Sequence, residues 1–112
     1  MFKHNQYTLS QIIEYVIDTQ YEDDDFCIYG DDKMPLDLGN SYLVSDYPEV
    51  INDRDDYPSD VKEKNLSLVY YGEQFTDVIC SALEQKPSAS EQELVDALIY
   101  YYQNDDFITF SS

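Results

Sequence analysis

Two segments with apolar residues at helical spacing, and the proline that follows the second, constrain this fold most. From Leu9 to about Thr19 the apolar residues form one stripe with a period of about 3.6 residues, which predicts an amphipathic helix. Thr8 and Gln11 are spaced for a capping box at its start. A second helix is predicted from about Gln74 to Gln85, because Pro87 prevents its continuation.

A third helix is predicted to begin near Ser90. Ser90 and Glu93 are spaced for another capping box, and acidic side chains in a first turn suit the positive end of the helix dipole. Its apolar face is expected to contain Leu94, Val95, Leu98, Tyr101 and Tyr102. The last two helices would then form a C-terminal αα-hairpin around Pro87.

Shorter apolar runs predict strands. The candidates are Phe26–Tyr29, Tyr42–Ser45 and Leu66–Tyr71, and Phe107–Phe110 is a possible fourth. Residues 46–65 hold two prolines and seven acidic residues with little periodicity, so we expect a long loop there. A loop of that length in a compact domain is often functional.

The composition fits a folded domain despite its acidity. The chain has 24 acidic and 6 basic residues, which gives a net charge of −18 at pH 7. Disordered acidic chains are poor in aromatic residues, whereas this sequence is 43% apolar and 15% aromatic. Three short helices and a small sheet of three to four strands predict an α+β fold, with residues 1–112 as a single domain.

The net charge also predicts the kind of partner. A strongly negative surface costs stability through self-repulsion, and it attracts cationic partners and speeds their association. The same surface is repelled by DNA, RNA and anionic lipid headgroups, so we expect neither direct nucleic-acid binding nor membrane binding. The expected partner is a cationic protein.

The acidic clusters do not match a known metal site. An EF-hand loop needs glycine at its sixth position and glutamate at its twelfth. Counted from Asp53, these positions hold Pro58 and Lys64, and counting from Asp23 fails in the same way. We therefore expect a solvated acidic surface and no metal ion.

Catalytic machinery and a cofactor are not expected either. The single histidine, His4, lies in a polar segment, and neither Cys27 nor Cys80 has a basic neighbour that would lower the pKa of its thiol. The three glycines are too far apart for a phosphate-binding loop. We predict a protein that is not an enzyme. Its two cysteines are expected to be free buried thiols, and without a signal segment the chain is expected to be cytoplasmic.

Tyrosine is unusually frequent, with 12 copies, several of them beside acidic residues. Tyrosine is a common anchor at protein interfaces. Residues 100–102 are three consecutive tyrosines, and successive side chains on a helix lie about 100° apart, so they cannot all face one core. We expect Tyr100 to be exposed.

This combination resembles the small acidic bacterial immunity proteins that neutralise nuclease toxins, of the colicin and contact-dependent growth inhibition types. The segments Ser90-Glu91-Gln92-Glu93-Leu94-Val95 and Leu98-Ile99-Tyr100-Tyr101 carry the resemblance. They are similar to the acidic helix and paired tyrosines that colicin DNase immunity proteins use against their toxins. Here they lie on one helix, and the predicted strands depart from an all-helical fold. The resemblance implies a mode of action, in which the protein binds a toxin without catalysis.

A nucleic-acid mimic of the anti-restriction or anti-CRISPR type is the alternative. Scattered acidic residues favour mimicry of phosphates, whereas the acidic clusters at residues 23–32 and 46–60 favour one binding patch. We predict an immunity protein, and the sequence leaves open whether it covers the toxin's active site or a neighbouring surface. Its predicted contact residues are Asp23, Asp24, Asp25, Asp31, Asp32, Asp53, Asp55, Asp56 and Tyr100.

Overall fold

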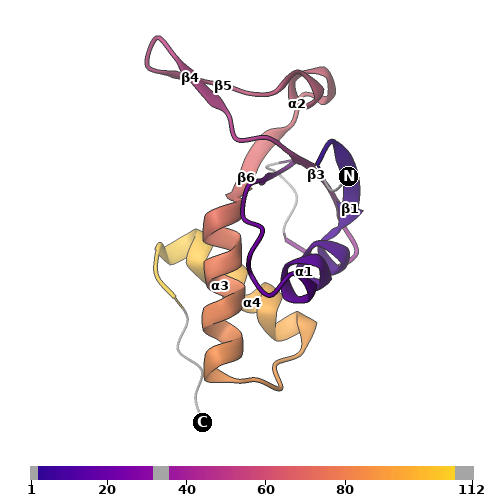
Figure 1. Ribbon diagram of the computed structural model, residues 1–112, viewed down its shortest axis with the longest axis vertical. Helices are drawn as coiled ribbons and strands as arrows, with labels where there is room; N and C mark the ends of the chain where they lie inside the picture. Colours follow the sequence, from indigo (N-terminus) through magenta and orange to yellow (C-terminus); the bar gives the residue numbers. More distant parts are fainter. Residues whose placement is uncertain (1–2, 32–35, 108–112) are drawn as a thin grey trace.

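The computed structural model describes residues 3–31 and 36–107 and has the predicted α+β fold (Figure 1). Within those residues, helices α1, α3 and α4 agree with the predicted helices, and strands β2, β3 and β6 with the predicted strands. The elements in chain order are β1 (Asn5–Thr8), α1 (Leu9–Asp18), β2 (Cys27–Gly30), β3 (Ser41–Ser45), β4 (Glu49–Ile51), β5 (Arg54–Asp56), α2 (Ser59–Lys64), β6 (Ser67–Tyr71), α3 (Gly72–Gln85) and α4 (Glu91–Asn104).

The main sheet has four antiparallel strands in the order β1-β3-β2-β6. Successive side chains along a strand point to opposite faces of the sheet, and both faces are covered. On one face, Ile28, Val44 and Tyr70 lie in a large core with α1, α3 and α4. On the other face, Tyr29 and Leu43 lie in a smaller core with α2.

Both predicted capping boxes are present. The hydroxyl of Thr8 accepts a hydrogen bond from the backbone N–H of Gln11 at 3.2 Å, and the side chain of Gln11 accepts one from Thr8. Ser90 and Glu93 make the equivalent pair at the start of α4. Helices α3 and α4 pack against each other as the predicted C-terminal hairpin.

Residues 46–65 are not the predicted long loop. They contain the β4–β5 hairpin and helix α2, and the hairpin projects from the body of the fold (Figure 1). Asn52 and Asp53 connect its strands with φ values of 53° and 63°, as in a type I′ turn. The strands are only three residues long and rich in charge, so they carry too little apolar alternation to be recognised.

Strand β1 was not predicted either, because Asn5–Thr8 is mostly polar and lies at the edge of the sheet. At the other end of the chain, the predicted strand Phe107–Phe110 lies mostly outside the described residues. Phe107 itself is not in a strand, and its ring centroid is 5.1 Å from that of Tyr101.

The three consecutive tyrosines divide as helical geometry requires. Tyr101 is half-buried, and its neighbours project to either side of it. Tyr100 is 39% exposed, which confirms the expectation for this residue, and Tyr102 is 58% exposed. The placement of Tyr102 in the apolar face of the helix was therefore wrong.

Both cysteines are free thiols, as predicted, with Cys27 buried and Cys80 only half-buried. Burial raises the pKa of the Cys27 thiol to about 11. In the described part of the chain, every helix is too short or too polar to cross a membrane.

Candidate functional site

An acidic concave surface lies at the base of the β4–β5 hairpin. This hollow has a volume of about 390 Å³ and is bounded by the end of β3, the hairpin, α2 and the segment before β1. Four carboxylates and two tyrosines line it: Asp46, Glu49, Asp56, Asp60, Tyr47 and Tyr57. We call it the acidic hollow.

The hairpin positions part of this lining. Strands β4 and β5 pair so that Glu49 lies directly opposite Asp56. Like charges at opposed strand positions disfavour the pairing. Lys62 on α2 relieves this repulsion through an ion pair with Asp56. The fold therefore holds two of the carboxylates that line the hollow close together.

His4 connects the two sides of the acidic hollow. Its Nδ1 lies 2.9 Å from Oδ2 of Asp60, and its Nε2 lies 3.4 Å from Oδ2 of Asp46. His4 has a φ of 67°, an uncommon conformation for a residue other than glycine. The single histidine of the chain thus lies between two carboxylates, with roughly half of its side chain exposed.

The carboxylate of Asp60 has further partners. Ser45 donates a hydrogen bond to Oδ1 of Asp60 at 2.9 Å, and the backbone N–H of Val61 donates another to the same oxygen. Partial burial works to raise the pKa of Asp60, but the hydrogen bonds from His4 and Ser45 outweigh it and hold the pKa below its ordinary value. Asp60 is therefore held in its charged form.

The trio of Ser45, His4 and Asp60 does not have the geometry of a nucleophilic triad. In such a triad the histidine bonds the nucleophile through one ring nitrogen and the carboxylate through the other. Here Nδ1 of His4 faces both Ser45 and Asp60, and Ser45 is fully buried with its hydroxyl donated to the carboxylate. These contacts fix the N-terminal segment against α2.

The acidic surface continues from the hollow onto the loop between α1 and β2. Nζ of Lys3 lies 2.8 Å from Oδ1 of Asp46 and 3.5 Å from Oδ2 of Asp25. The hydroxyl of Tyr47 donates to the backbone carbonyl of Asp24 at 3.0 Å. Lys3 and Tyr47 therefore join the Asp24–Asp25 loop to the acidic hollow.

The structure brings together some of the predicted contact residues. Asp56 lines the acidic hollow, Asp24 and Asp25 adjoin it, and Asp53 lies in the hairpin turn. Asp55 lies opposite Val50 in the backbone register of the hairpin. Asp23 accepts a hydrogen bond from the hydroxyl of Tyr15, which raises the pKa of Tyr15 to about 12.

Two further predicted residues lie outside the lining of the hollow. Asp31 is exposed directly after β2, and Tyr100 is on α4, in the C-terminal helix pair. Asp32 lies outside the described residues. The described members of the predicted set thus divide among the acidic hollow with its neighbouring loop, the β4–β5 hairpin and two separate positions.

The predicted contact residues omit three of the four carboxylates that line the hollow, Asp46, Glu49 and Asp60. The turn residues Asn52-Asp53 between Val50-Ile51 and Arg54 are the signal that could have found one of them. A hairpin centred on that turn places Glu49 against Asp56. Asp60 could not be found in this way, because its place depends on how α2 packs on the sheet.

Lysine side chains of the protein itself neutralise only part of its acidic surface. Lys3, Lys62 and Lys86 each pair with carboxylates in the described part of the chain. Over the same residues, the structure contains no group of three or more histidine, cysteine, aspartate or glutamate side chains placed to hold a metal ion.

Fold and hollow together define a small acidic α+β domain with a projecting hairpin. Residues 6–110 match a family described as a domain of unknown function, DUF7716, and the chain belongs to that family. No curated protein and no solved structure matches the chain.

Proposed function

We propose that this protein is a cytoplasmic immunity protein that binds and neutralises a cationic toxin, with a nuclease as the expected toxin class. The observation that carries the proposal is the acidic hollow, where four carboxylates and two tyrosines gather at the base of a projecting hairpin. No catalysis is needed for this role, because occupying the toxin's surface is sufficient.

The composition of the hollow suits a lysine-rich or arginine-rich surface. Carboxylates at its wall attract basic side chains, and Tyr47 and Tyr57 offer rigid aromatic surface that loses little side-chain entropy on binding. Nuclease domains carry positive charge where they bind phosphates. A net charge of −18 would steer such a domain towards this protein over long range.

The β4–β5 hairpin supplies an apolar contact beside the carboxylates. Val50 and Ile51 are 72% and 48% exposed, although they are adjacent residues and so point to opposite faces of β4. Burial of either side chain by a partner would stabilise the complex through the hydrophobic effect. The hairpin therefore supports the proposal that the toxin contacts this arm as well as the hollow.

Gene context and co-expression test the proposal. We expect the neighbouring upstream gene to encode a large secreted protein with a variable C-terminal toxin domain. Cells that produce that toxin domain together with the wild-type protein should grow. The variant Glu49→Gln/Asp56→Asn should associate more slowly with the toxin and protect less, and the association rate of the wild type should fall as salt is raised.

The matched control is Glu14→Gln/Asp77→Asn, which removes the same charge from exposed positions on α1 and α3 outside the hollow. It should retain both the association rate and protection. Circular dichroism and thermal melting would verify that both variants are folded. Equal association rates and equal protection for the two variants would remove the acidic hollow from the binding surface.

A nucleic-acid mimic is the second candidate, and the acidic residues outside the hollow favour it. Asp31, Asp105 and Asp106 are exposed on other parts of the fold. A mimic would inhibit several unrelated DNA-binding enzymes and would be encoded in a phage locus. An immunity protein would act on one cognate toxin. Inhibition assays with a panel of unrelated DNA-binding enzymes therefore separate the two candidates.

A further inference from the structure

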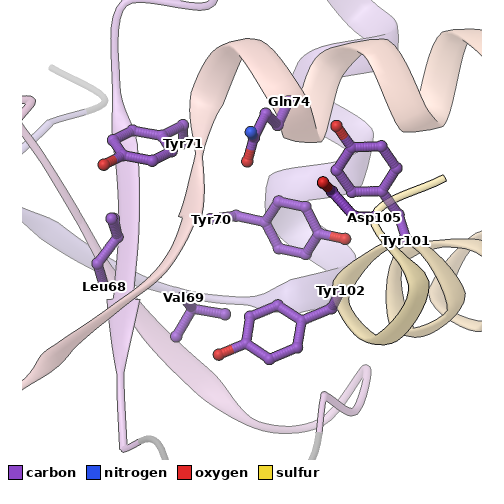
Figure 2. A pocket seen from close by; sticks show the side chains of 8 residues that line it. All are labelled: Leu68, Val69, Tyr70, Tyr71, Gln74, Tyr101, Tyr102 and Asp105. Carbon is purple, nitrogen blue, oxygen red and sulfur yellow. The ribbon is translucent and has the colours of Figure 1, made fainter.

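A second concave surface lies between strand β6 and the C-terminal turns of α4 (Figure 2). It has a volume of about 240 Å³, and four consecutive residues of β6, residues 68–71, form one wall. Gln74 of α3 and Tyr101, Tyr102 and Asp105 at the end of α4 complete it. We call this surface the tyrosine groove.

The tyrosine groove runs along an outer edge of the sheet formed by the described strands. In the strand order of the main sheet, β6 is terminal and pairs with β2 on one side. Figure 2 shows Leu68 and Tyr71 on one side of the strand, with Val69 and Tyr70 on the other. A groove that touches residues from both faces must follow the strand's edge, where backbone N–H and C=O groups are presented.

Strand β6 has few of the features that normally protect an edge. Edge strands are usually blunted by charged residues or proline, and Ser67–Tyr71 contains neither. It does carry a β-bulge, because the register with β2 passes from Leu68 to Tyr70 and leaves Val69 as the extra residue. Bulges are frequent beside binding sites, where they redirect side chains.

Tyrosine rings from the β6 wall and from α4 pack together inside the groove. Tyr70 is nearly buried and donates its hydroxyl proton to the backbone carbonyl of Leu98. Its ring centroid lies 5.9 Å from that of Tyr102 and 6.4 Å from that of Tyr101. Tyr102 is 58% exposed at the mouth of the groove, so its ring is available to a bound molecule.

The charge of the groove selects a cationic occupant. Asp105 lines it and Asp106 follows, whereas no lysine, arginine or histidine of the described chain does so. Asp105 adopts a left-handed conformation with a φ of 54° and ends α4. A guanidinium group could contact the face of Tyr102 and the carboxylate of Asp105 together, because cations bind over aromatic rings.

We propose that the tyrosine groove binds an extended, arginine-rich segment of another protein, which adds to β6 as a further strand. Main-chain hydrogen bonds to the edge of β6 supply affinity, and an arginine side chain between Tyr102 and Asp105 supplies specificity. This site is separate from the acidic hollow, so it does not depend on the proposed immunity function.

The test uses the full chain and a synthetic peptide of alternating arginine and valine. Because a protein this acidic attracts any basic peptide, the decisive probe is the same peptide with alternate backbone amides N-methylated, which keeps its charge and removes strand pairing. The unmodified peptide should bind about tenfold more tightly than the N-methylated one. This is the effect expected from roughly one net hydrogen bond between uncharged groups. Its binding should shift the NMR signals of the backbone amides of β6.

Two variants locate the arginine site. Tyr102→Ala should weaken the unmodified peptide about two- to fivefold, the usual range for an exposed cation–π contact. Asp105→Asn should also weaken it, and asparagine tolerates the left-handed conformation at this position. Asp96→Asn, an equal charge change at an exposed position of the same helix, should leave the affinity unchanged.

Three outcomes would overturn the proposal. Equal affinity for the two peptides would show that charge alone drives binding. Shifts confined to the acidic hollow would place the peptide there and would leave the proposed function intact. Self-association of the free protein that Tyr102→Ala abolishes would make a second copy of this chain the occupant of the groove.

Discussion

The backbone N–H of Gly72 donates a hydrogen bond to the carbonyl oxygen of Phe26 at 2.7 Å, where the start of α3 meets the start of β2. A Cβ atom on residue 72 would lie 2.2 Å from that oxygen and 2.8 Å from the carbonyl oxygen of Asp24. This close approach fixes the acidic loop before β2 against the junction of β6 and α3.

Substitution of Gly72 by alanine should therefore destabilise the fold. The backbone oxygens cannot move aside without disturbing β2, and overpacking of this kind costs about 1–3 kcal/mol. Urea unfolding followed by circular dichroism would measure the change. Gly39→Ala is the control, because a Cβ there meets no atom within 4 Å. Equal stability of the two variants would contradict the role given to this contact.

Tyr47 reaches the same junction from the other side. Its hydroxyl donates to the carbonyl of Asp24 at 3.0 Å and accepts from the backbone N–H of Glu73 at 3.1 Å, while its ring stacks on Tyr71. Tyr47→Phe keeps the stacking and removes both hydrogen bonds. The free energy of unfolding should fall by about 1 kcal/mol, since each bond contributes modestly in a partly solvated setting.

Hydrogen exchange would separate a local effect of Tyr47→Phe from a global one. Faster exchange of the amides of Glu73 and Asp25, with the core of α1 unaffected, is expected. Tyr100→Phe removes a hydroxyl from an exposed position of α4 and should change neither measurement. A loss of stability in Tyr47→Phe no larger than in Tyr100→Phe would show that the two bonds do not contribute.

The sequence alone predicted those elements whose signal is local. Helices α1 and α4 begin directly after Thr8 and Ser90, because each capping box is complete within four residues, and strands such as β3 carry a compact apolar run. The β4–β5 hairpin was not predicted, because its strands are very short and its exposed residues include the apolar Val50 and Ile51. Exposed apolar residues break the alternation of apolar and polar residues by which a half-buried strand is recognised in a sequence.

The candidate site was less predictable because it forms between distant segments. His4 and Asp60 are 56 residues apart, and Lys3 and Asp25 are 22 apart. Density of acidic residues along the chain pointed to the region 46–60, which contains Asp56, but it did not single out Asp46 or Asp60. Such contacts depend on the tertiary packing of β1 and α2 against β3.

The two thiols should differ in reactivity. Cys27 is fully buried, and burial raises its pKa to about 11, so little thiolate is present at mildly alkaline pH. Cys80 is only half-buried, and burial together with the nearby Glu84 raises its pKa as well.

With a chromogenic disulfide reagent, we expect slow labelling of Cys80 in the folded protein and labelling of Cys27 only on unfolding. In Cys80→Ser, the labelling rate should follow the unfolding rate; rapid labelling of that variant under native conditions would contradict the burial of Cys27.

Asp60 should make stability depend on pH in the acid range. Partial burial opposes the effect, but the hydrogen bonds from His4 and Ser45 dominate and lower its pKa in the folded state below the ordinary 3.8. The unfolded chain therefore takes up a proton at this site first, so the stabilisation is fully present above that ordinary value and is lost as pH falls through the folded-state pKa.

Asp60→Asn should accordingly be less stable than the wild type near neutral pH, and the difference should narrow as the pH falls below the ordinary aspartate value of 3.8. Urea midpoints measured over a series of pH values would reveal this convergence. The control is Asp18→Asn, which removes an exposed carboxylate of α1 that is not bonded to His4 or Ser45. If the gap between Asp60→Asn and the wild type stayed constant with pH, the hydrogen bonds to Asp60 would not depend on its charge, and its place as an anchored carboxylate of the acidic hollow would have to be abandoned.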